Sequence, residues 1–201
     1  MSKMSKKKVI GITGSMGSGK SEISRYLRKK YPVLDCDQVN ADLLKKGNLG
    51  YQKLNDLHIV ELDSNGEIIK ESLASYMFSN IEHRKQVEAI LHPLIFDEMH
   101  KWIHEQESLM VFVEMPILFE ISAQEHFDSI WCVVADLDVA LSRLQTYRNF
   151  TREQAMARLV SQMNPEEKMA KSDIVLRNNS TVEQLHMQIE DALKEEKLNG
   201  D

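Results

Sequence analysis

The amino-acid sequence predicts an α/β protein with a parallel five-stranded β-sheet and helices on both of its faces. Short runs of β-branched and other apolar residues alternate along the chain with longer helical patterns, which is typical of βαβ units. These apolar runs are continuous rather than alternating, as expected for strands that are covered on both faces. The first run leads into a glycine-rich loop and then a helical pattern, so we expect a ligand at the carboxyl ends of the strands.

Each element follows from a local pattern. The expected strands are Val9–Thr13, Val33–Leu34, Met110–Val113, Ile130–Ala135 and Ile174–Leu176. The expected helices are Lys20–Lys30, roughly Leu73–Ile90, Leu94–Glu105, Val139–Tyr147, Glu153–Met163 and Val182–Lys194. The last two helices follow capping boxes at Thr151 and Thr181, and Pro93 suits the first turn of the helix that it precedes. The segment between the second and third strands is too long for an ordinary crossover, so it should form a helical lobe.

Composition and charge exclude several classes of function. The 201 residues are 42% hydrophobic and 28% charged, with a formal net charge of −6, which opposes non-specific adhesion to nucleic acid or anionic membranes. There is no signal-peptide pattern and no apolar run long enough to span a bilayer. Cys36 and Cys132 are too few for a disulfide framework. We therefore expect a cytoplasmic monomer or weak homo-oligomer that acts on a small molecule, without nucleic-acid or membrane partners.

The glycine-rich loop matches a phosphate-binding motif. Residues Gly14–Ser21, "GSMGSGKS", fit the pattern G-x-x-x-x-G-K-[ST] in its strand–loop–helix setting, which predicts a three-layer P-loop NTPase fold. Glycines let successive N–H groups converge on phosphate oxygens, and the helix that follows presents its positive end to the same anion. Lys20 is expected to contact the β- and γ-phosphates of ATP, and the Ser21 hydroxyl to bind Mg²⁺. The expected nucleotide-binding residues here are Gly14, Ser15, Met16, Gly17, Ser18, Gly19, Lys20, Ser21 and Glu22.

Carboxylates follow three of the predicted strands. Asp35 and Asp37 come after the second strand, Glu114 after the third and Asp136 after the fourth. Phosphoryl transfer to a hydroxyl needs a held Mg²⁺ and a carboxylate that orients or deprotonates the acceptor, and Asp35 and Asp37 could divide these tasks. The alternative is that one of this pair, or Asp136, only caps the helix that follows it.

Four arginines lie close together in the C-terminal half of the chain: Arg143, Arg148, Arg152 and Arg158. Kinases of this general type close a helical lid whose arginines neutralise charge on the transferred phosphoryl group and exclude water. Arg143 and Arg148 flank a predicted helix end and are the better candidates. The alternative for all four is a solvated helix face.

Six segments lie in a fixed order along nearly the whole chain. The phosphate loop "GITGSMGSGKSE" is followed by "VLDCDQVNADLL", "LHPLI", "EMPILFE", "LSRLQTYRNFTREQAMARLVSQM" and "SDIVLRNN". Together they resemble the dephospho-coenzyme A kinase family of P-loop kinases, in which the last five correspond to the D-x-D, L-H-P, P-L-L-F-E, lid and A-D-x-x-x-x-N patterns. The phosphate loop is shared by many enzymes, whereas the order of the other segments is more specific.

The resemblance implies an enzyme that phosphorylates the ribose 3′-hydroxyl of dephospho-coenzyme A with ATP and Mg²⁺, the last step of coenzyme A synthesis. By position, Asp37 would be the catalytic base, with Asp35 beside the metal or the acceptor. Lys70, His92 and Glu120 would bind the acceptor, Arg143 and Arg148 would act on the transition state, and Asn178 would line the adenine pocket. Residues 1–201 would form one kinase domain, with a core at about 8–50, 108–140 and 172–197, an acceptor-binding lobe at about 51–107 and a lid at about 141–170.

Four positions depart from the family pattern. Glu22 replaces a threonine, Glu114 an aspartate, Lys70 an arginine and Ser172 an alanine. The carboxylate of Glu22 would repel an α-phosphate. Lys70 would hold an acceptor phosphate only as a point charge.

Two other functions remain open on the residues alone. A kinase for nucleosides or nucleoside monophosphates would share the fold, the phosphate loop and the lid, and would differ in the acceptor lobe. A nucleotide-dependent switch protein would need the N-K-x-D and D-x-x-G motifs if it bound guanine, and neither occurs. A non-kinase ATPase would turn over ATP without an acceptor.

Overall fold

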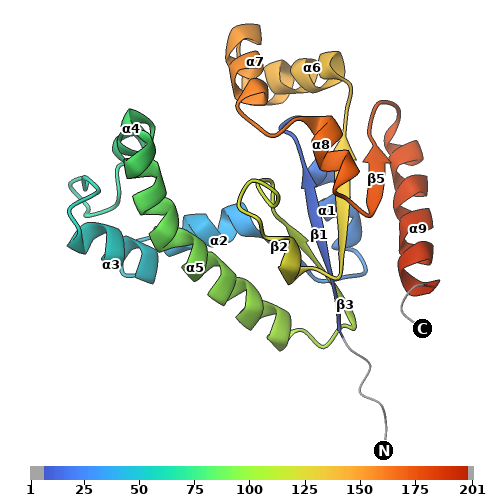
Figure 1. The fold of residues 1–201 in the computed structure, drawn as a ribbon, viewed down its shortest axis with the longest axis horizontal. Coiled ribbons are helices and arrows are strands. Elements are labelled where there is room, and N and C mark those ends of the chain that lie inside the picture. Colours follow the sequence, from blue (N-terminus) through green and yellow to red (C-terminus); the bar gives the residue numbers. More distant parts are fainter. Residues whose placement is uncertain (1–6, 199–201) are drawn as a thin grey trace, which may run out of the picture. The chain divides into compact units, whose positions relative to one another are not determined.

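The fold is built on a five-stranded sheet, in a computed structural model that describes residues 7–198. The strands, given in their order across the sheet, are β2 (Val33–Asp35), β3 (Met110–Glu114), β1 (Lys8–Gly14), β4 (Ser129–Val134) and β5 (Ile174–Arg177). The pairings of β1 with β3, of β1 with β4 and of β4 with β5 are parallel. Figure 1 shows β1 in the middle of this sheet, where its carboxyl end leads into the phosphate loop. The predicted fold class is confirmed.

The chain divides into two compact units. The first consists of the residues up to Leu34 together with those from Gln106 onward, and the second is Asp35–Glu105. The sequence predicts that the acceptor-binding lobe starts at about residue 51. The second unit of the structure already begins at Asp35. The reason is that α2 (Cys36–Leu43) packs against helices of the second unit.

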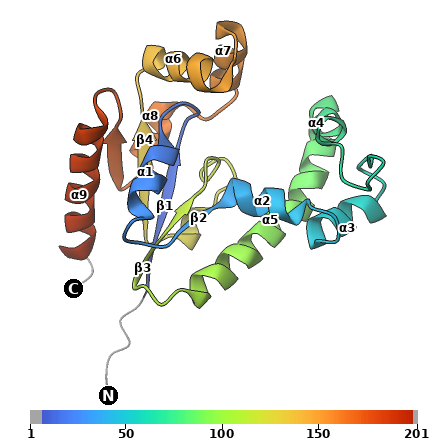
Figure 2. The same ribbon diagram turned by 180° about the vertical axis from the view of Figure 1, so that it is seen from behind.

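Helices cover both faces of the sheet in the first unit. The helices of this unit are α1 (Lys20–Leu27), α6 (Leu137–Arg148), α7 (Arg152–Val160), α8 (Pro165–Ala170) and α9 (Val182–Leu198). Of these, α6 and α7 lie beyond the carboxyl ends of the strands and not on a face of the sheet (Figure 1). Figures 1 and 2 show α1 and α8 on opposite faces, and α9 packs against α1 and β5. The core between sheet and helices is made of fully buried side chains, among them Ile10, Ile12, Ile23, Phe112, Trp131 and Ile189. A sheet packed on both faces explains why its strands are continuously apolar.

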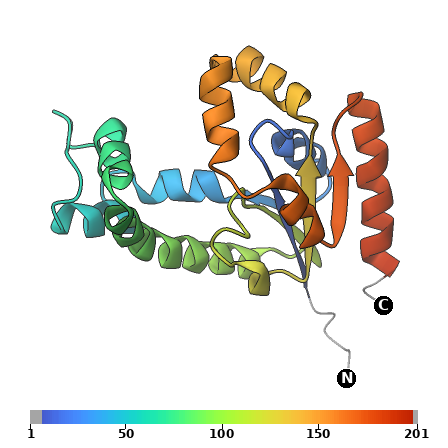
Figure 3. The same cartoon turned by 45° about the horizontal axis from the view of Figure 1, so that its top comes forward.

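The segment between β4 and β5 folds into the helices α6, α7 and α8. Figure 3 shows α6 and α7 as two successive helices that leave β4 and return to the sheet through α8. Thr151 caps α7 in a complete capping box with Gln154, as predicted. At the second predicted box, the N–H of Gln184 donates to Thr181 Oγ1 at 3.4 Å. Leu141, Leu144 and Ala155 form a small buried cluster that joins α6 to α7.

The second unit contains α2, α3 (Leu49–Asp56), α4 (Lys70–Ser79) and α5 (Ile81–Glu105). Helices α3, α4 and α5 share a buried cluster of Leu54, Ile59, Leu73, Val87 and Leu91. An antiparallel bridge between Leu62 and Ile68 closes the turn between α3 and α4.

The helix boundaries around Pro93 differ from the prediction. Pro93 lies inside α5 and does not begin a helix; the break instead falls at Asn80, whose backbone is extended. Proline removes one hydrogen bond to the carbonyl four residues earlier, here that of Ala89. Both residues are exposed, so water can bind this carbonyl and the helix continues. Elsewhere α1 ends at Leu27 instead of Lys30, and the short helices α3 and α8 were not predicted.

Candidate active site

The phosphate loop has the backbone that its glycines predict. Gly14 and Gly19 both have positive φ, 146° and 98°. A Cβ atom at Gly14 would lie 2.2 Å from the carbonyl oxygen of Val133, and one at Gly19 would lie 2.0 Å from Nδ2 of Asn178. No side chain fits at either position, because the contacts are with backbone or with a buried amide. The loop therefore keeps the tight path that phosphate binding requires.

The loop leads directly into the N-terminus of α1. Gly19 is the N-cap and offers no side chain to the helix, so the first N–H groups of α1 remain for an anion. Lys20 is 9% exposed, and its ammonium donates to the carbonyl oxygens of Gly14 at 2.8 Å and Ser15 at 3.1 Å. Ser21 is exposed at the second position of the helix. A phosphate group fits this cradle of N–H groups with a lysine at its edge.

Arg143 and Asn178 contact the loop from the other side. One Arg143 nitrogen, Nη2, donates to Asn178 Oδ1 at 3.1 Å, and Nη1 donates to the carbonyl oxygens of Gly17 and Ser18 at 3.4 Å each. Asn178 is 6% exposed and donates through Nδ2 to Ser18 O at 2.9 Å. The amide of Asn178 thus fixes both the loop and the guanidinium of Arg143.

The other lid arginines lie farther along α6 and α7. Arg148 is exposed at the last position of α6. Arg152 pairs with Asp138 at 3.8 Å, and the guanidinium of Arg158 lies 4.7 Å from the ring centroid of Phe150. Arg152 and Arg158 therefore have contacts within the lid, as expected for a helix face, whereas Arg148 projects into solvent.

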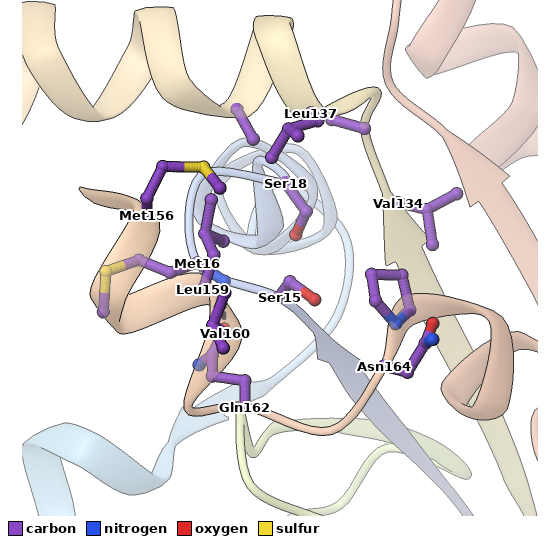
Figure 4. A pocket seen from close by; sticks show the side chains of 13 residues that line it. Ser15, Met16, Ser18, Val134, Leu137, Met156, Leu159, Val160, Gln162 and Asn164 are labelled. Carbon is purple, nitrogen blue, oxygen red and sulfur yellow. Dashed lines mark hydrogen bonds between the residues drawn. The ribbon is translucent and has the colours of Figure 1, made fainter. Parts of the chain in front are cut away.

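A cavity lies between the phosphate loop and the lid helices (Figure 4). Its volume is ≈ 360 Å³. Ser15, Met16 and Ser18 of the loop line it together with residues of β4, α6, α7 and the segment after α7. Ser18 Oγ is buried and has no hydrogen-bond partner among residues 7–198. A buried hydroxyl without a partner is costly, which fits a polar ligand at this loop.

Glu22 is held by basic partners. It pairs with Arg25, one turn further along α1, and Glu22 Oε1 lies 3.1 Å from Nε2 of His186 on α9. Burial opposes ionisation, but the hydrogen bonds from Arg25 and His186 keep the pKa of Glu22 below its usual value. His186 also stacks on Tyr26 with ring centroids 4.1 Å apart. Arg25 and His186 thus partly compensate the negative charge of Glu22 that would repel a phosphate. No sequence motif identifies His186.

Two further carboxylates at the strand ends make structural contacts. Glu114 is 6% exposed and accepts a hydrogen bond from Ser24 Oγ at 2.6 Å, one turn beyond Ser21 on α1. Asp136 occupies the N-cap position of α6, but its carboxylate makes no cap hydrogen bond and accepts from Asn179 Nδ2 at 2.8 Å. The alternative that the Asp136 side chain caps α6 is therefore wrong, because its carboxylate binds Asn179 instead of the N–H groups of the helix.

Glu120 binds a lysine that the sequence analysis did not single out. Its Oε1 lies 2.8 Å from Nζ of Lys168, whose side chain is fully buried, and accepts from the N–H of Met163 at 3.3 Å. Nearby, the N–H of Met16 in the phosphate loop donates to Gln162 Oε1 at 2.9 Å. Gln162 lies in the quoted lid segment and Lys168 in no motif, so only the folded chain identifies the contacts of both.

The second unit carries Asp35, Asp37, Lys70 and His92. Asp35 caps α2, because its carboxylate accepts the N–H groups of Asp37 at 2.9 Å and Gln38 at 3.3 Å. Asp37 is exposed in the first turn of that helix, and Lys70 is exposed at the start of α4. His92 is half-buried in α5; burial lowers the pKa of its imidazole and Arg84 adds to this, while Glu88 opposes it.

The donor set at the start of α1 suits Mg²⁺. No group of three or more His, Cys, Asp or Glu side chains able to hold a metal occurs in the described part of the chain. Mg²⁺ in nucleotide sites keeps several water ligands and binds one or two protein oxygens beside the phosphates, so no such cluster is required. The Ser21 hydroxyl and the buried Glu114 near α1 are oxygen donors of this kind.

No helix within residues 7–198 combines the length and the apolar character needed to cross a membrane.

Comparisons with known proteins agree with one another. The dephospho-CoA kinase family model matches residues 8–184. The chain is 35% identical over 191 residues to a dephospho-CoA kinase of Bacillus cereus, with 92% of this chain and 96% of that protein covered. It is 31% identical over 183 residues to one from Fusobacterium nucleatum, covering 90% and 95%.

Solved structures show the same fold. A structure from Thermus thermophilus has a TM-score of 0.83 at 32% identity, covering 94% of this chain and 98% of that one. A dephospho-CoA kinase from Campylobacter jejuni has a TM-score of 0.69 at 23% identity, covering 97% and 100%. A shikimate kinase from Bacteroides thetaiotaomicron has a TM-score of 0.53 at 12% identity, covering 94% and 98%, and supports the fold alone.

Proposed function

Because this chain belongs to the dephospho-CoA kinase family, whose reaction is the ATP-dependent phosphorylation of the 3′-hydroxyl of dephospho-coenzyme A, we propose how its residues perform that transfer. The observation that carries the proposal is that the family match includes both the phosphate loop and the whole lid segment. The first product is coenzyme A and the second is ADP.

The phosphate loop binds the triphosphate. Its N–H groups and the N-terminus of α1 hold the phosphate oxygens, and Lys20 turns its ammonium from the carbonyls of Gly14 and Ser15 toward the β- and γ-phosphates. The partly compensated charge of Glu22 supports its place among the nucleotide-binding residues.

Ser21 would hold Mg²⁺, and Asp35 as a second ligand stays a prediction from the sequence. When bound, the ion neutralises charge on the β- and γ-phosphate oxygens.

Arg143 and Arg148 stabilise the phosphoryl group in the transition state of the transfer. Arg143 is fixed by Asn178 and lies against the phosphate loop, which supports a role in orienting the nucleotide. Arg148 is exposed at the end of α6 and is proposed to reach the transferred group when the lid segment at about 141–170 closes. Asn178 lines the adenine pocket in the same proposal, although its amide already binds the loop and Arg143.

Asp37 accepts the proton of the 3′-hydroxyl as that oxygen attacks the γ-phosphorus and the bond from phosphorus to the β,γ-bridging oxygen breaks. Its exposure in the first turn of α2 supports access to an acceptor. The Asp35 carboxylate accepts hydrogen bonds as the cap of that helix. Lys70, His92 and Glu120 are proposed to bind the acceptor. A cytoplasmic location and a monomer or weak homo-oligomer also remain predictions.

One assay tests the proposal. ADP release is measured with ATP and Mg²⁺ in the presence of dephospho-coenzyme A, of a nucleoside monophosphate, of shikimate, or of no acceptor. We expect rapid release only with dephospho-coenzyme A, with one coenzyme A formed per ADP. Equal release without acceptor would identify an ATPase, and preference for another acceptor would reject the substrate.

A further inference from the structure

A fully buried cation lies at the end of the lid segment and has no role in the transfer described above. Lys168 of α8 has a side chain that is 0% exposed. Its ammonium pairs with Glu120 Oε1 at 2.8 Å and donates to the carbonyl oxygen of Pro116 at 3.0 Å. Replacing a buried ion pair by apolar side chains of similar volume is often neutral or stabilising. Stability alone therefore does not account for a lysine at this position.

The partners of Lys168 connect the lid to the phosphate loop. Glu120 Oε1 also accepts the N–H of Met163, just after α7. The Pro116 carbonyl also accepts a hydrogen bond from Thr13 Oγ1 at 3.1 Å, and Thr13 directly precedes Gly14. Through these two acceptors, Lys168 connects the end of the lid to Thr13, the residue just before the phosphate loop.

Two other observations concern the same segment. The segment Gln162–Lys168 is here called the lid-end segment. Its first residue, Gln162, accepts a hydrogen bond from the N–H of Met16, so this end of the segment also contacts the phosphate loop. Burial raises the pKa of the Cys132 thiol on β4, while a hydrogen bond with Ser172 and then the charges of Lys168 and Lys20 oppose this rise. Both ammonium groups thus act on one buried atom of the central sheet.

We propose that Lys168 is a positioning residue for phosphoryl transfer, which acts through Glu120 and the Pro116 carbonyl to hold the lid-end segment in register with the phosphate loop. The lid carries the arginines that meet the transferred group, and a displacement of about 1 Å in such groups lowers rates by about 10²-fold. Lys168 itself touches no substrate. The inference rests on the proposed function only in assigning the lid to the transfer step.

The test compares Lys168→Met with Lys171→Met, an exposed lysine at the end of the same helix. ATP-binding sites are titrated with a fluorescent ATP analogue, and kcat per site, both KM values and the melting temperature are measured. We expect Lys168→Met to lower kcat per ATP-binding site about 10-fold or more while KM for ATP stays within about threefold. Lys171→Met should match the wild type.

A double-mutant cycle tests the route through Glu120. If Lys168 acts by holding this carboxylate, Lys168→Met combined with Glu120→Gln should lower kcat little more than the larger single effect. If Lys168→Met does not fold, Lys168→Gln decides, because its shorter, uncharged side chain leaves Glu120 in place but cannot hold both acceptors. Lower kcat per site is then expected; a change confined to KM for dephospho-coenzyme A would overturn the inference.

Two outcomes separate this inference from the proposed function. If the Lys168→Met enzyme has the same kcat per ATP-binding site as the wild type and the Lys171→Met enzyme, Lys168 is only a structural residue. A lower melting temperature of Lys168→Met would not change this conclusion. Absence of coenzyme A formation by the wild-type enzyme would instead reject the proposed function.

Discussion

At the scale of single residues, Lys20 combines burial with two backbone acceptors that it can exchange for phosphate. Its ammonium already lies inside the loop, on the carbonyls of Gly14 and Ser15, so little reorganisation is needed when the triphosphate binds. Preorganised charge of this kind contributes most where negative charge develops during transfer.

Lys20→Ala should therefore lower kcat by at least about 100-fold, as expected when one preorganised charge is removed from the site of transfer. Steady-state turnover of coenzyme A formation measures this, and Lys29→Ala, an exposed lysine beyond the end of α1, is the control. A Lys20→Ala enzyme with most of its turnover would contradict the assignment of the loop.

Asp37 and Asp35 are separated by one residue but have different surroundings. Asp37→Asn keeps the shape of the side chain and cannot take a proton, so kcat should fall by about 10²–10⁴-fold while the affinity for Mg·ATP stays close to that of the wild type. Turnover and ATP binding are measured together, with the exposed Asp56→Asn as control. Full activity would move the base role to Asp35.

The residues that sequence reasoning missed share one property: their partners are distant in the chain. The P-loop residues follow from a contiguous motif, whereas Lys168 in "PEEKMAKSD" looks like any exposed lysine of a short, charged helix. Its burial depends on Glu120 and Pro116, which come from another loop. The same holds for His186, which meets Glu22 only because α9 packs against α1.

At the scale of elements, the central strands β3, β1 and β4 could be predicted because each is a continuous apolar run, and burial on both faces leaves such runs few alternatives. The helices of the second unit were harder to predict. Pro93 has a local preference for a helix start, but α5 continues through it, since packing of Val87, Leu91 and Leu94 holds both halves of the helix. Tertiary packing here overrides a local signal.

The last turn of α9 is fastened to the sheet by one carboxylate. Glu196 is 3% exposed, pairs with Lys8 at 2.6 Å and accepts hydrogen bonds from Ser129 Oγ and from Trp131 Nε1 at 2.8 Å. Burial opposes the charge, but these partners keep the pKa of Glu196 below its ordinary value of 4.5. This group therefore links α9 to β1 and β4.

Glu196→Gln should lower the free energy of unfolding by about 1.5–3 kcal/mol at pH 7, because hydrogen bonds to a charged group are lost or weakened. Since the folded-state pKa is depressed, the wild-type advantage should be full well above pH 4.5 and should vanish as the pH falls through the lower folded-state pKa. Urea unfolding at several pH values measures this. The exposed Glu195→Gln is the control, and a pH-independent difference would contradict the role of the charge.

At the scale of the whole molecule, the proposed nucleotide-binding residues all belong to the unit that contains the sheet. The phosphate loop, Arg143, Arg148 and Asn178 lie in that unit, as does Glu120 of the acceptor set, whereas Lys70 and His92 lie in the unit Asp35–Glu105. The two substrates should therefore change hydrogen exchange in different parts of the two units.

Hydrogen exchange measured by mass spectrometry can separate these effects. A non-hydrolysable ATP analogue at about 100 times its Kd stabilises the form that binds it by about 2.7 kcal/mol, so exchange should slow in α1, α6 and β5. Without acceptor, exchange in α4 and α5 should change little. Dephospho-coenzyme A should slow exchange around Lys70 and His92, whereas Lys20→Ala should weaken the effect of the ATP analogue and leave that of the acceptor. Protection of α4 and α5 by the ATP analogue alone would contradict the assignment of Lys70 and His92 to the acceptor.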